Sequence, residues 1–166
     1  EKITITDKDN AGSLHDKLMI NGGKLVLKTV KAIEEDNYTN TPQNKLYKDE
    51  SELKHAPKIF KDDCKIDWND NITSINNKIR GLSPYPCAWM ELINDKGDKT
   101  TMKIYAAEIA ESSNNTLALK TDDKTFLKIE TPTGTISLTD IQLAGKKRMK
   151  IEDFLRGNSL NDYTLN

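Results

Sequence analysis

The sequence has little of what marks a metal, disulfide or membrane protein. Its 166 residues include two cysteines, Cys64 and Cys87, and two histidines, His15 and His55. The cysteines lie far apart in different contexts, which is typical of neither a disulfide framework nor a zinc site. No apolar run approaches the roughly eighteen residues of a membrane span. We therefore expect a soluble cytoplasmic domain with packed thiols, no metal and no membrane contact.

Net charge is also lacking, since 25 cations face 26 anions. A polyanion partner would have to be bound by a local patch, because the overall field of such a chain is weak. The candidate patch is "GKKRMK", whose cations are Lys146, Lys147, Arg148 and Lys150. Amine and guanidinium groups bind phosphate through charge. The alternative is a solvated lysine-rich turn.

In "EKITIT" (1–6), polar and apolar residues alternate, which predicts a strand. The apolar residues that follow recur with a helical period. The helical apolar positions are Leu14, Leu18, Leu25, Val30 and Ile33. They predict one helix, or two joined near Gly22 and Gly23, where we expect a break or a close backbone contact. Asp9 or Asn10 can cap the helix.

Residues 37–57 are polar and aperiodic, which predicts a linker with a short helical turn around residues 50–53. After residue 58, a capped amphipathic helix is predicted to bury Ile72, Ile75, Ile79 and Leu82. Strand-like segments then recur about every ten residues: "CAWMELI", "TTMKIYAAEI", "NTLALKT", "KTFLKIET" and "GTISLTDIQL". A turn before the third would use Asn114 or Asn115. A small closed barrel would protect the edges of such a sheet.

Two further cations flank Ile79 in the predicted helix. Lys78 and Arg80 can frame its buried face while staying exposed. Arg80 could bind a phosphate or stack on a base, or it could pair with a carboxylate such as Asp67 or Glu91. These alternatives remain open from the sequence.

The two tryptophans, Trp68 and Trp89, are interpreted as core residues, with a base-stacking surface as the alternative. The adjacent carboxylate pairs are interpreted as solvated surface. No catalytic residue is predicted.

Several motifs occur in the order found in one enzyme family. They are "HAPKI" (55–59), "IDW" (66–68), "NNKIRGLSPYPCAW" (76–89) and "IQLAGKKRM" (141–149). Together they resemble the C-terminal part of the methionyl-tRNA formyltransferase family, and "DNAGSLHDKL" (9–18) resembles the last helix of its catalytic domain. Cys87 stands where the family often has glycine or another small residue.

The resemblance implies a mainly β fold, a small oligonucleotide-binding-type β-barrel with short helices, preceded by a helical remnant of an α/β domain. It divides the chain into a catalytic-domain remnant (1–36), a linker (37–57) and the barrel domain (58–166). Because Glu1 lies inside a strand-like stretch, we expect a piece of a longer chain.

The family transfers a formyl group from 10-formyltetrahydrofolate to methionyl initiator tRNA. Its catalytic asparagine, histidine and aspartate lie in the N-terminal domain and match nothing here, so we expect this part to be inactive alone and to hold no cofactor. The implied role is to bind and position initiator tRNA for the catalytic domain of the same, monomeric chain. The expected tRNA-binding residues are Lys146, Lys147, Arg148, Lys150, Arg80, Lys78 and Lys58. For Lys58 and its neighbour Lys61, an ordinary polar connector is the alternative.

Two rival interpretations stay open. Amino-sugar formyltransferases and the hydrolase portion of formyltetrahydrofolate dehydrogenase carry a similar "IDW…IR…P" segment before a similar barrel. The basic "GKKRM" favours the tRNA enzyme, because a sugar nucleotide offers only two phosphates. The second rival is a stand-alone RNA- or protein-binding barrel.

Overall fold

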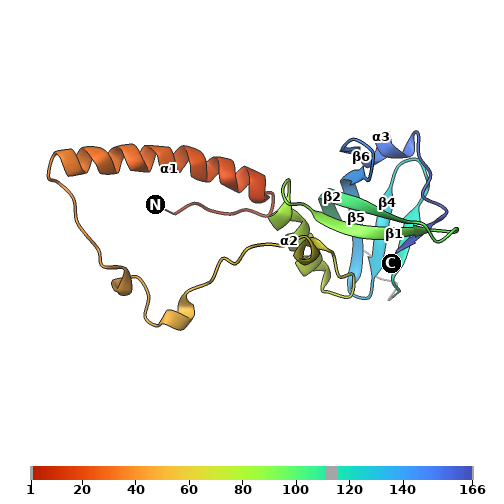
Figure 1. The fold of residues 1–166 in the computed structure, drawn as a ribbon, viewed down its shortest axis with the longest axis horizontal. Helices are drawn as coiled ribbons and strands as arrows, with labels where there is room; N and C mark the ends of the chain where they lie inside the picture. Colours follow the sequence, from red (N-terminus) through yellow and green to blue (C-terminus); the bar gives the residue numbers. More distant parts are fainter. Residues whose placement is uncertain (1, 111–115, 166) are drawn as a thin grey trace.

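Two parts of the chain differ in how much apolar surface they bury. The computed structural model describes residues 2–110 and 116–165. In it, the helix α1 (Ala11–Glu34) extends away from a β-barrel and buries none of its residues (Figure 1). The hydrophobic core of the described residues lies in the barrel, in the short helices packed on it and in the segments that join them.

The start of α1 is fixed by a reciprocal cap. Asn10 Oδ1 accepts from the Ser13 amide at 2.9 Å, and Ser13 Oγ accepts from the Asn10 amide at 3.0 Å. This pairing satisfies amides that the first helical turn leaves without partners. The prediction of Asn10 as a cap is confirmed.

The expected break or close contact at Gly22 and Gly23 is wrong. Helix α1 runs through both residues, and a Cβ at either would meet no atom within 4 Å. Each glycine costs about 1 kcal/mol relative to alanine, but the helical hydrogen bonds on both sides of the pair continue across it.

The strand predicted for residues 1–6 is also not observed. The described part, residues 2–6, is irregular and mostly exposed, and no described strand pairs with it. A strand needs a neighbour for its backbone hydrogen bonds, and sequence alternation alone does not supply one. The segment ends instead in a turn, where the Asp9 carboxylate accepts from Thr6, Ser13 and Lys17.

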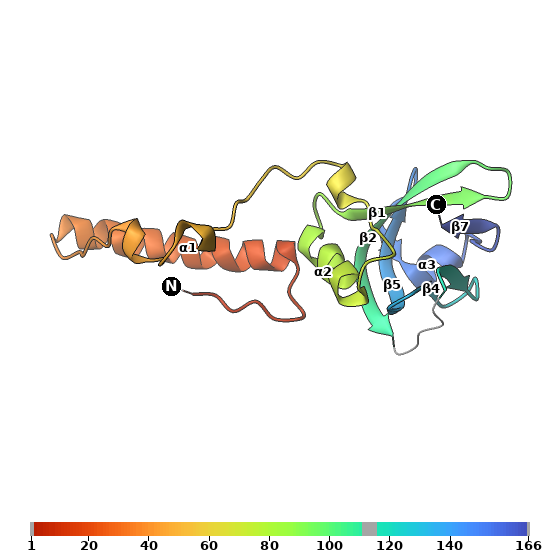
Figure 2. The ribbon, with the colours of Figure 1, turned by 90° about the horizontal axis from the view of Figure 1, so that it is seen from below.

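The connection from α1 to the barrel is polar and exposed. It contains two short 3₁₀ helices, η1 (Gln43–Lys45) and η2 (Glu50–Glu52), and the second confirms the helical turn predicted there. Figure 2 shows this segment returning from the far end of α1 to the barrel, which it enters beside a third turn, η3 (Asp62–Cys64).

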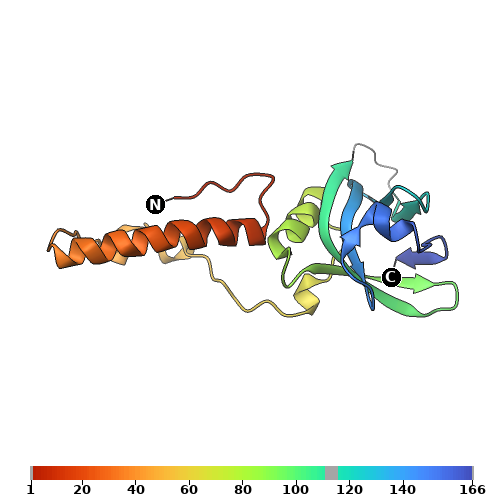
Figure 3. The same cartoon turned by 90° about the horizontal axis from the view of Figure 1, so that it is seen from above.

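The helix α2 (Ile72–Leu82) has the predicted cap and buried face. Asn71 Oδ1 accepts from the Thr73 amide at 2.9 Å. The buried residues are Ile72, Ile75, Ile79 and Leu82, as predicted. Figure 3 shows α2 between α1 and the sheet.

Among the residues that the structure describes, seven strands form the barrel: β1 (Ala88–Asn94), β2 (Lys99–Ala110), β3 (Ala118–Thr121), β4 (Leu127–Thr131), β5 (Gly134–Leu143), β6 (Met149–Lys150) and β7 (Tyr163–Leu165). They run antiparallel in the order β3-β4-β5-β2-β1-β7, and β6 pairs with β5. The end strands β3 and β7 line one pocket of about 290 Å³, so the barrel is nearly closed. The predicted turn at Asn114 or Asn115 lies outside the described residues.

Core packing follows the alternation of the strands and a few special positions. The helix α3 (Ile151–Leu155) contributes Phe154, which is 1% exposed. Gly134 opens β5 at a φ of 153°, and a Cβ there would lie 3.2 Å from Ile72 Cγ2, so α2 can pack closely on the sheet. Trp68 is buried as predicted, whereas Trp89 is only half-buried on the outer face of β1.

Candidate nucleic-acid interface

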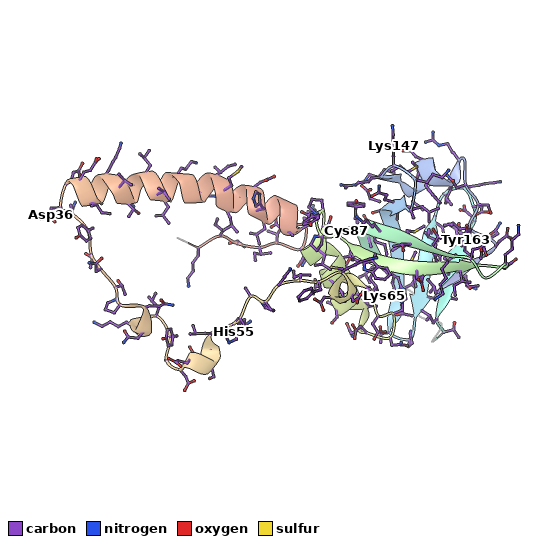
Figure 4. The ribbon with its side chains drawn as sticks, in the orientation of Figure 1. Asp36, His55, Lys65, Cys87, Lys147 and Tyr163 are labelled. Atoms are coloured by element: carbon purple, nitrogen blue, oxygen red, sulfur yellow. The ribbon has the colours of Figure 1, made fainter. Side chains whose placement is uncertain are left out.

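The predicted basic patch lies on the turn between β5 and β6. The Lys146 amide donates to the Leu143 carbonyl at 2.9 Å, and Gly145 has a φ of 77°. This φ at the third position of a four-residue turn is typical of a type II turn, which favours glycine there. Lys146 and Lys147 follow it and are exposed. Figure 4 shows Lys147 pointing outward at one edge of the barrel.

The other two cations of the patch are paired. Arg148 Nε and Nη2 donate to the two carboxylate oxygens of Asp140 at 2.9 and 3.0 Å. Lys150 Nζ lies 3.1 Å from Asp140 Oδ2. Burial of Asp140 alone would raise the pKa of its carboxyl, but the hydrogen bonds from Arg148 and Lys150 outweigh burial and hold that pKa below its ordinary value.

Two aromatic and amide contacts hold the turn against the sheet. The Arg148 guanidinium carbon lies 4.1 Å from the centroid of the Tyr105 ring, within range of a cation–π interaction. The Tyr105 hydroxyl donates to Gln142 Oε1 at 2.9 Å, and Gln142 Nε2 donates to the Lys146 carbonyl at 3.0 Å. Arg148 thus supports the turn, while Lys146 and Lys147 have no ion-pair partner among the described residues.

A lysine on β2 lies between this turn and the strand β1. Lys103 on β2 pairs in register with Gln142 on β5 and with Trp89 on β1. It is exposed on the outer face of the sheet. The sequence analysis missed Lys103, although the alternation of β2 around the buried Met102 and Ile104 could have placed it outward.

Two more lysine amines lie close to the ring of Trp89. The amines of Lys61 and Lys65 each lie 5.5 Å from its ring centroid, and its Nε1 donates to the Lys61 carbonyl at 2.8 Å. Lys65 was likewise missed, because its place beside Trp89 depends on a β-bridge between residues that lie far apart in the sequence.

The remaining predicted cations have local partners. Arg80 Nη1 donates to the carbonyls of Thr6, Asp7 and Asp9 at 3.0, 2.9 and 2.7 Å. These contacts join the segment before α1 to α2, and the binding of Arg80 to a phosphate or a base stays a prediction. Lys78 Nζ donates to the Lys65 carbonyl at 2.7 Å, and the Lys58 amine lies 5.2 Å from the Phe60 ring.

The two cysteines are buried thiols. Burial raises the pKa of the Cys87 thiol to about 11, and its Sγ donates to the Ile104 carbonyl at 3.3 Å. Cys87 also adopts a φ of 78°, a conformation that suits glycine. Within the described ranges, no three His, Cys, Asp or Glu side chains gather as metal ligands, and no helix has the length and apolarity to cross a membrane.

The structure thus defines a small antiparallel β-barrel with a basic turn and an adjoining free helix. Residues 58–159 match the family model described as "Formyl transferase, C-terminal domain", and the chain belongs to this family. The resemblance predicted from the motifs is confirmed by curated relatives. The methionyl-tRNA formyltransferase of Phocaeicola vulgatus is 46% identical over 97% of this chain and 50% of its own length. That of Parabacteroides distasonis is 43% identical over 98% of this chain and 51% of its own length.

The chain therefore spans about half the length of the curated relatives it matches. Among solved structures, HypX from Aquifex aeolicus superposes with a TM-score of 0.62 at 16% identity, covering 95% of this chain and 27% of HypX. A second HypX structure, in complex with tetrahydrofolic acid, superposes with a TM-score of 0.53 at 17% identity, covering 83% of this chain and 23% of HypX. At these identities the likeness concerns the fold alone.

Proposed function

We propose that this chain is the tRNA-positioning part of a cytoplasmic methionyl-tRNA formyltransferase. The observation that carries the proposal is the 46% identity to a relative of that name, extending over 97% of the chain. The whole enzyme would transfer a formyl group from 10-formyltetrahydrofolate to the methionyl group on initiator tRNA. The described residues contribute binding groups to that reaction and no reacting group.

The organisation we propose has three parts. Residues 1–36 would belong with a catalytic domain that accounts for the other half of the relatives' length, residues 37–57 would be a linker, and residues 58–166 would be a barrel domain of the oligonucleotide-binding type. The support for the first part is α1 itself. Its exposed apolar side chains include Leu18, Met19, Ile20, Val26, Leu27 and Ile33, each 52–64% exposed. This many large apolar side chains exposed on one helix are typical of an interface.

The proposed mechanism is positioning. A paired RNA stem hides its base edges in a deep, narrow groove, so a protein recognises it through shape and phosphates. Lys146 and Lys147 are exposed on a turn held by Arg148 and Tyr105, and no described residue forms an ion pair with either lysine, which suits them to contact phosphates. Holding the aminoacyl end beside the catalytic groups lowers the barrier without a reactive group from the barrel. Each chain would act as a monomer.

The test is the salt dependence of initiator-tRNA binding by the Lys146→Ala/Lys147→Ala double variant. Each phosphate contact contributes a slope of roughly 0.7–0.9 in log affinity against log salt. We expect the variant to bind more weakly and with a slope smaller by about 1.4–1.8, measured by titration between about 50 and 200 mM salt.

A matched control changes two exposed lysines on the β3–β4 hairpin, Lys120→Ala/Lys124→Ala, and so removes the same charge elsewhere. This control should retain most of the affinity. Equal losses in both double variants, or no loss in either, would contradict the assignment of the turn.

A further inference from the structure

A groove of about 290 Å³ opens on the outer face of the barrel. Its lining residues come from two segments before β1, which contribute Phe60 and Lys61 and then Tyr85, and from the strands β1 and β2, which contribute Trp89 and Lys103. In Figure 4 the labelled Cys87, another lining residue, lies at the end of the barrel that faces α1.

The walls of this groove expose aromatic rings to solvent. Tyr85 is 85% exposed and Phe60 is 60% exposed. Both belong to short segments that are anchored by buried neighbours, Cys64 four residues after Phe60 and Cys87 two residues after Tyr85. Large exposed rings on a fixed backbone form a binding surface that costs little ordering when a ligand arrives.

The charged residues that line the groove are all basic. Lys61 and Lys103 are among its lining residues, and none of the lining residues is an aspartate or glutamate. Lys65 and Lys58 add amines close to the Trp89 and Phe60 rings, at 5.5 and 5.2 Å from their centroids. Aromatic platforms beside amines are the combination that binds single-stranded nucleic acid, because each nucleotide offers a flat base and an anionic phosphate.

We propose that this groove binds an unpaired nucleotide of the bound RNA, with the base against Phe60 or Tyr85 and the phosphate near Lys61 and Lys103. The inference rests on the proposed function and extends it from the paired stem to an unpaired position. The groove is continuous with the basic turn, because Lys103 lies beside Gln142, whose amide binds the Lys146 carbonyl. Trp89 and Gln142 are two strands apart, about 10 Å, so one RNA molecule can contact both sites.

The experiment compares two probes on the whole chain: an adenine hexaribonucleotide and a blunt-ended RNA hairpin of about twelve base pairs, closed by an ethylene-glycol linker so that it has no unpaired nucleotide. The groove variant is Phe60→Ala/Tyr85→Ala. Both side chains are largely exposed, and their loss leaves the core intact. A matched control, Tyr38→Ala/Leu46→Ala, removes exposed apolar side chains from the linker.

We expect the hexaribonucleotide to bind and to quench the fluorescence of Trp89. The fluorescence of the buried Trp68 should not change. The groove variant should bind this probe about tenfold more weakly or worse, with unchanged affinity for the hairpin and no effect in the linker control. The Lys146→Ala/Lys147→Ala variant should chiefly weaken the hairpin.

Three outcomes would overturn the inference. If the groove variant binds the hexaribonucleotide as well as wild type, the groove has no role in RNA binding. Hairpin binding that still depends on Lys146 and Lys147 would leave the proposed function standing. If RNA binding is unchanged but the variant binds the N-terminal half of the Phocaeicola vulgatus relative more weakly, the groove is a protein interface. If neither RNA binds wild type even at low salt, the proposed function falls too.

Discussion

Replacing Asp140 by asparagine should change stability and RNA affinity in opposite directions. Asp140 is 6% exposed and accepts from Arg148 and Lys150 at 2.9–3.1 Å. Their side chains are 47% and 66% exposed, so solvent screens each pair to about 0.5–1 kcal/mol. The Asp140→Asn variant should therefore lose about 1–2 kcal/mol of unfolding free energy, a fall in Tm of about 2–8 °C for a chain of this size.

The same substitution removes an anion from the basic turn and frees two cations for phosphate. Initiator tRNA should then bind more tightly and with a steeper salt slope, by up to about 0.9 for each added contact. Thermal denaturation and salt titration measure the two effects, with Asp70→Asn as an exposed control of equal charge change. Weaker or unchanged tRNA binding by a folded Asp140→Asn variant would refute the reasoning.

The pH dependence provides a further check on Asp140. Its folded pKa lies below the ordinary value because of Arg148 and Lys150, although burial acts in the opposite direction. A lowered folded pKa stabilises the protein above the unfolded carboxyl pKa of about 4, and this stabilisation is lost as pH falls through the folded value. The stability difference between wild type and Asp140→Asn should therefore be full near neutral pH and shrink in acid.

Two other predictions concern the junction and the thiols. Arg80→Ala removes the donor to three carbonyls of residues 6–9, so amide hydrogen exchange should accelerate around Asp9 while the barrel strands keep their protection. Arg156→Ala, an equal loss of charge, should leave both unchanged, and an unaltered Asp9 region in Arg80→Ala would contradict the contact. Burial raises the Cys87 pKa to about 11, so stabilisation present below the unfolded thiol pKa of about 8.5 should be lost toward pH 11. This loss should be smaller in Cys87→Ala, and rapid labelling of Cys87 in the folded protein at pH 8 would contradict its burial.

The sequence predicted local structure where local chemistry decides it. The period of Ile72, Ile75, Ile79 and Leu82 required a buried helical face, and the strand segments alternated around what became the core. Both patterns reflect burial of one side of an element, which any packing partner would demand. The predictions at residues 1–6 and at Gly22–Gly23 failed because a partner strand and the continuation of a long helix depend on more than local pattern.

The candidate site was predictable only in outline. Four cations close together in the sequence indicated a patch. Which of them form ion pairs depends on Asp140, which the β-sheet register places opposite Lys150. Arg80 was equally ambiguous, because its carbonyl partners lie more than seventy positions earlier in the chain. Pairing between distant segments decides which cations remain available to bind phosphate. The register of that pairing cannot be read directly from a single sequence.

The joint between α1 and the barrel links the helix to the proposed RNA surface. The Gly12 amide donates to the Ser83 carbonyl at 3.0 Å, and a Cβ on Gly12 would lie 2.6 Å from Pro84 Cδ, so only glycine allows this approach without displacement. Tyr85, two residues after Ser83, lines both the groove and a pocket beside the start of α1. A catalytic domain packed on α1 would therefore border the groove, and an unpaired nucleotide held there would enter the space between the two domains. Under the proposed function, the contacts of Arg80 and Gly12 would set the angle between α1 and the barrel, and so the space in which the RNA is positioned.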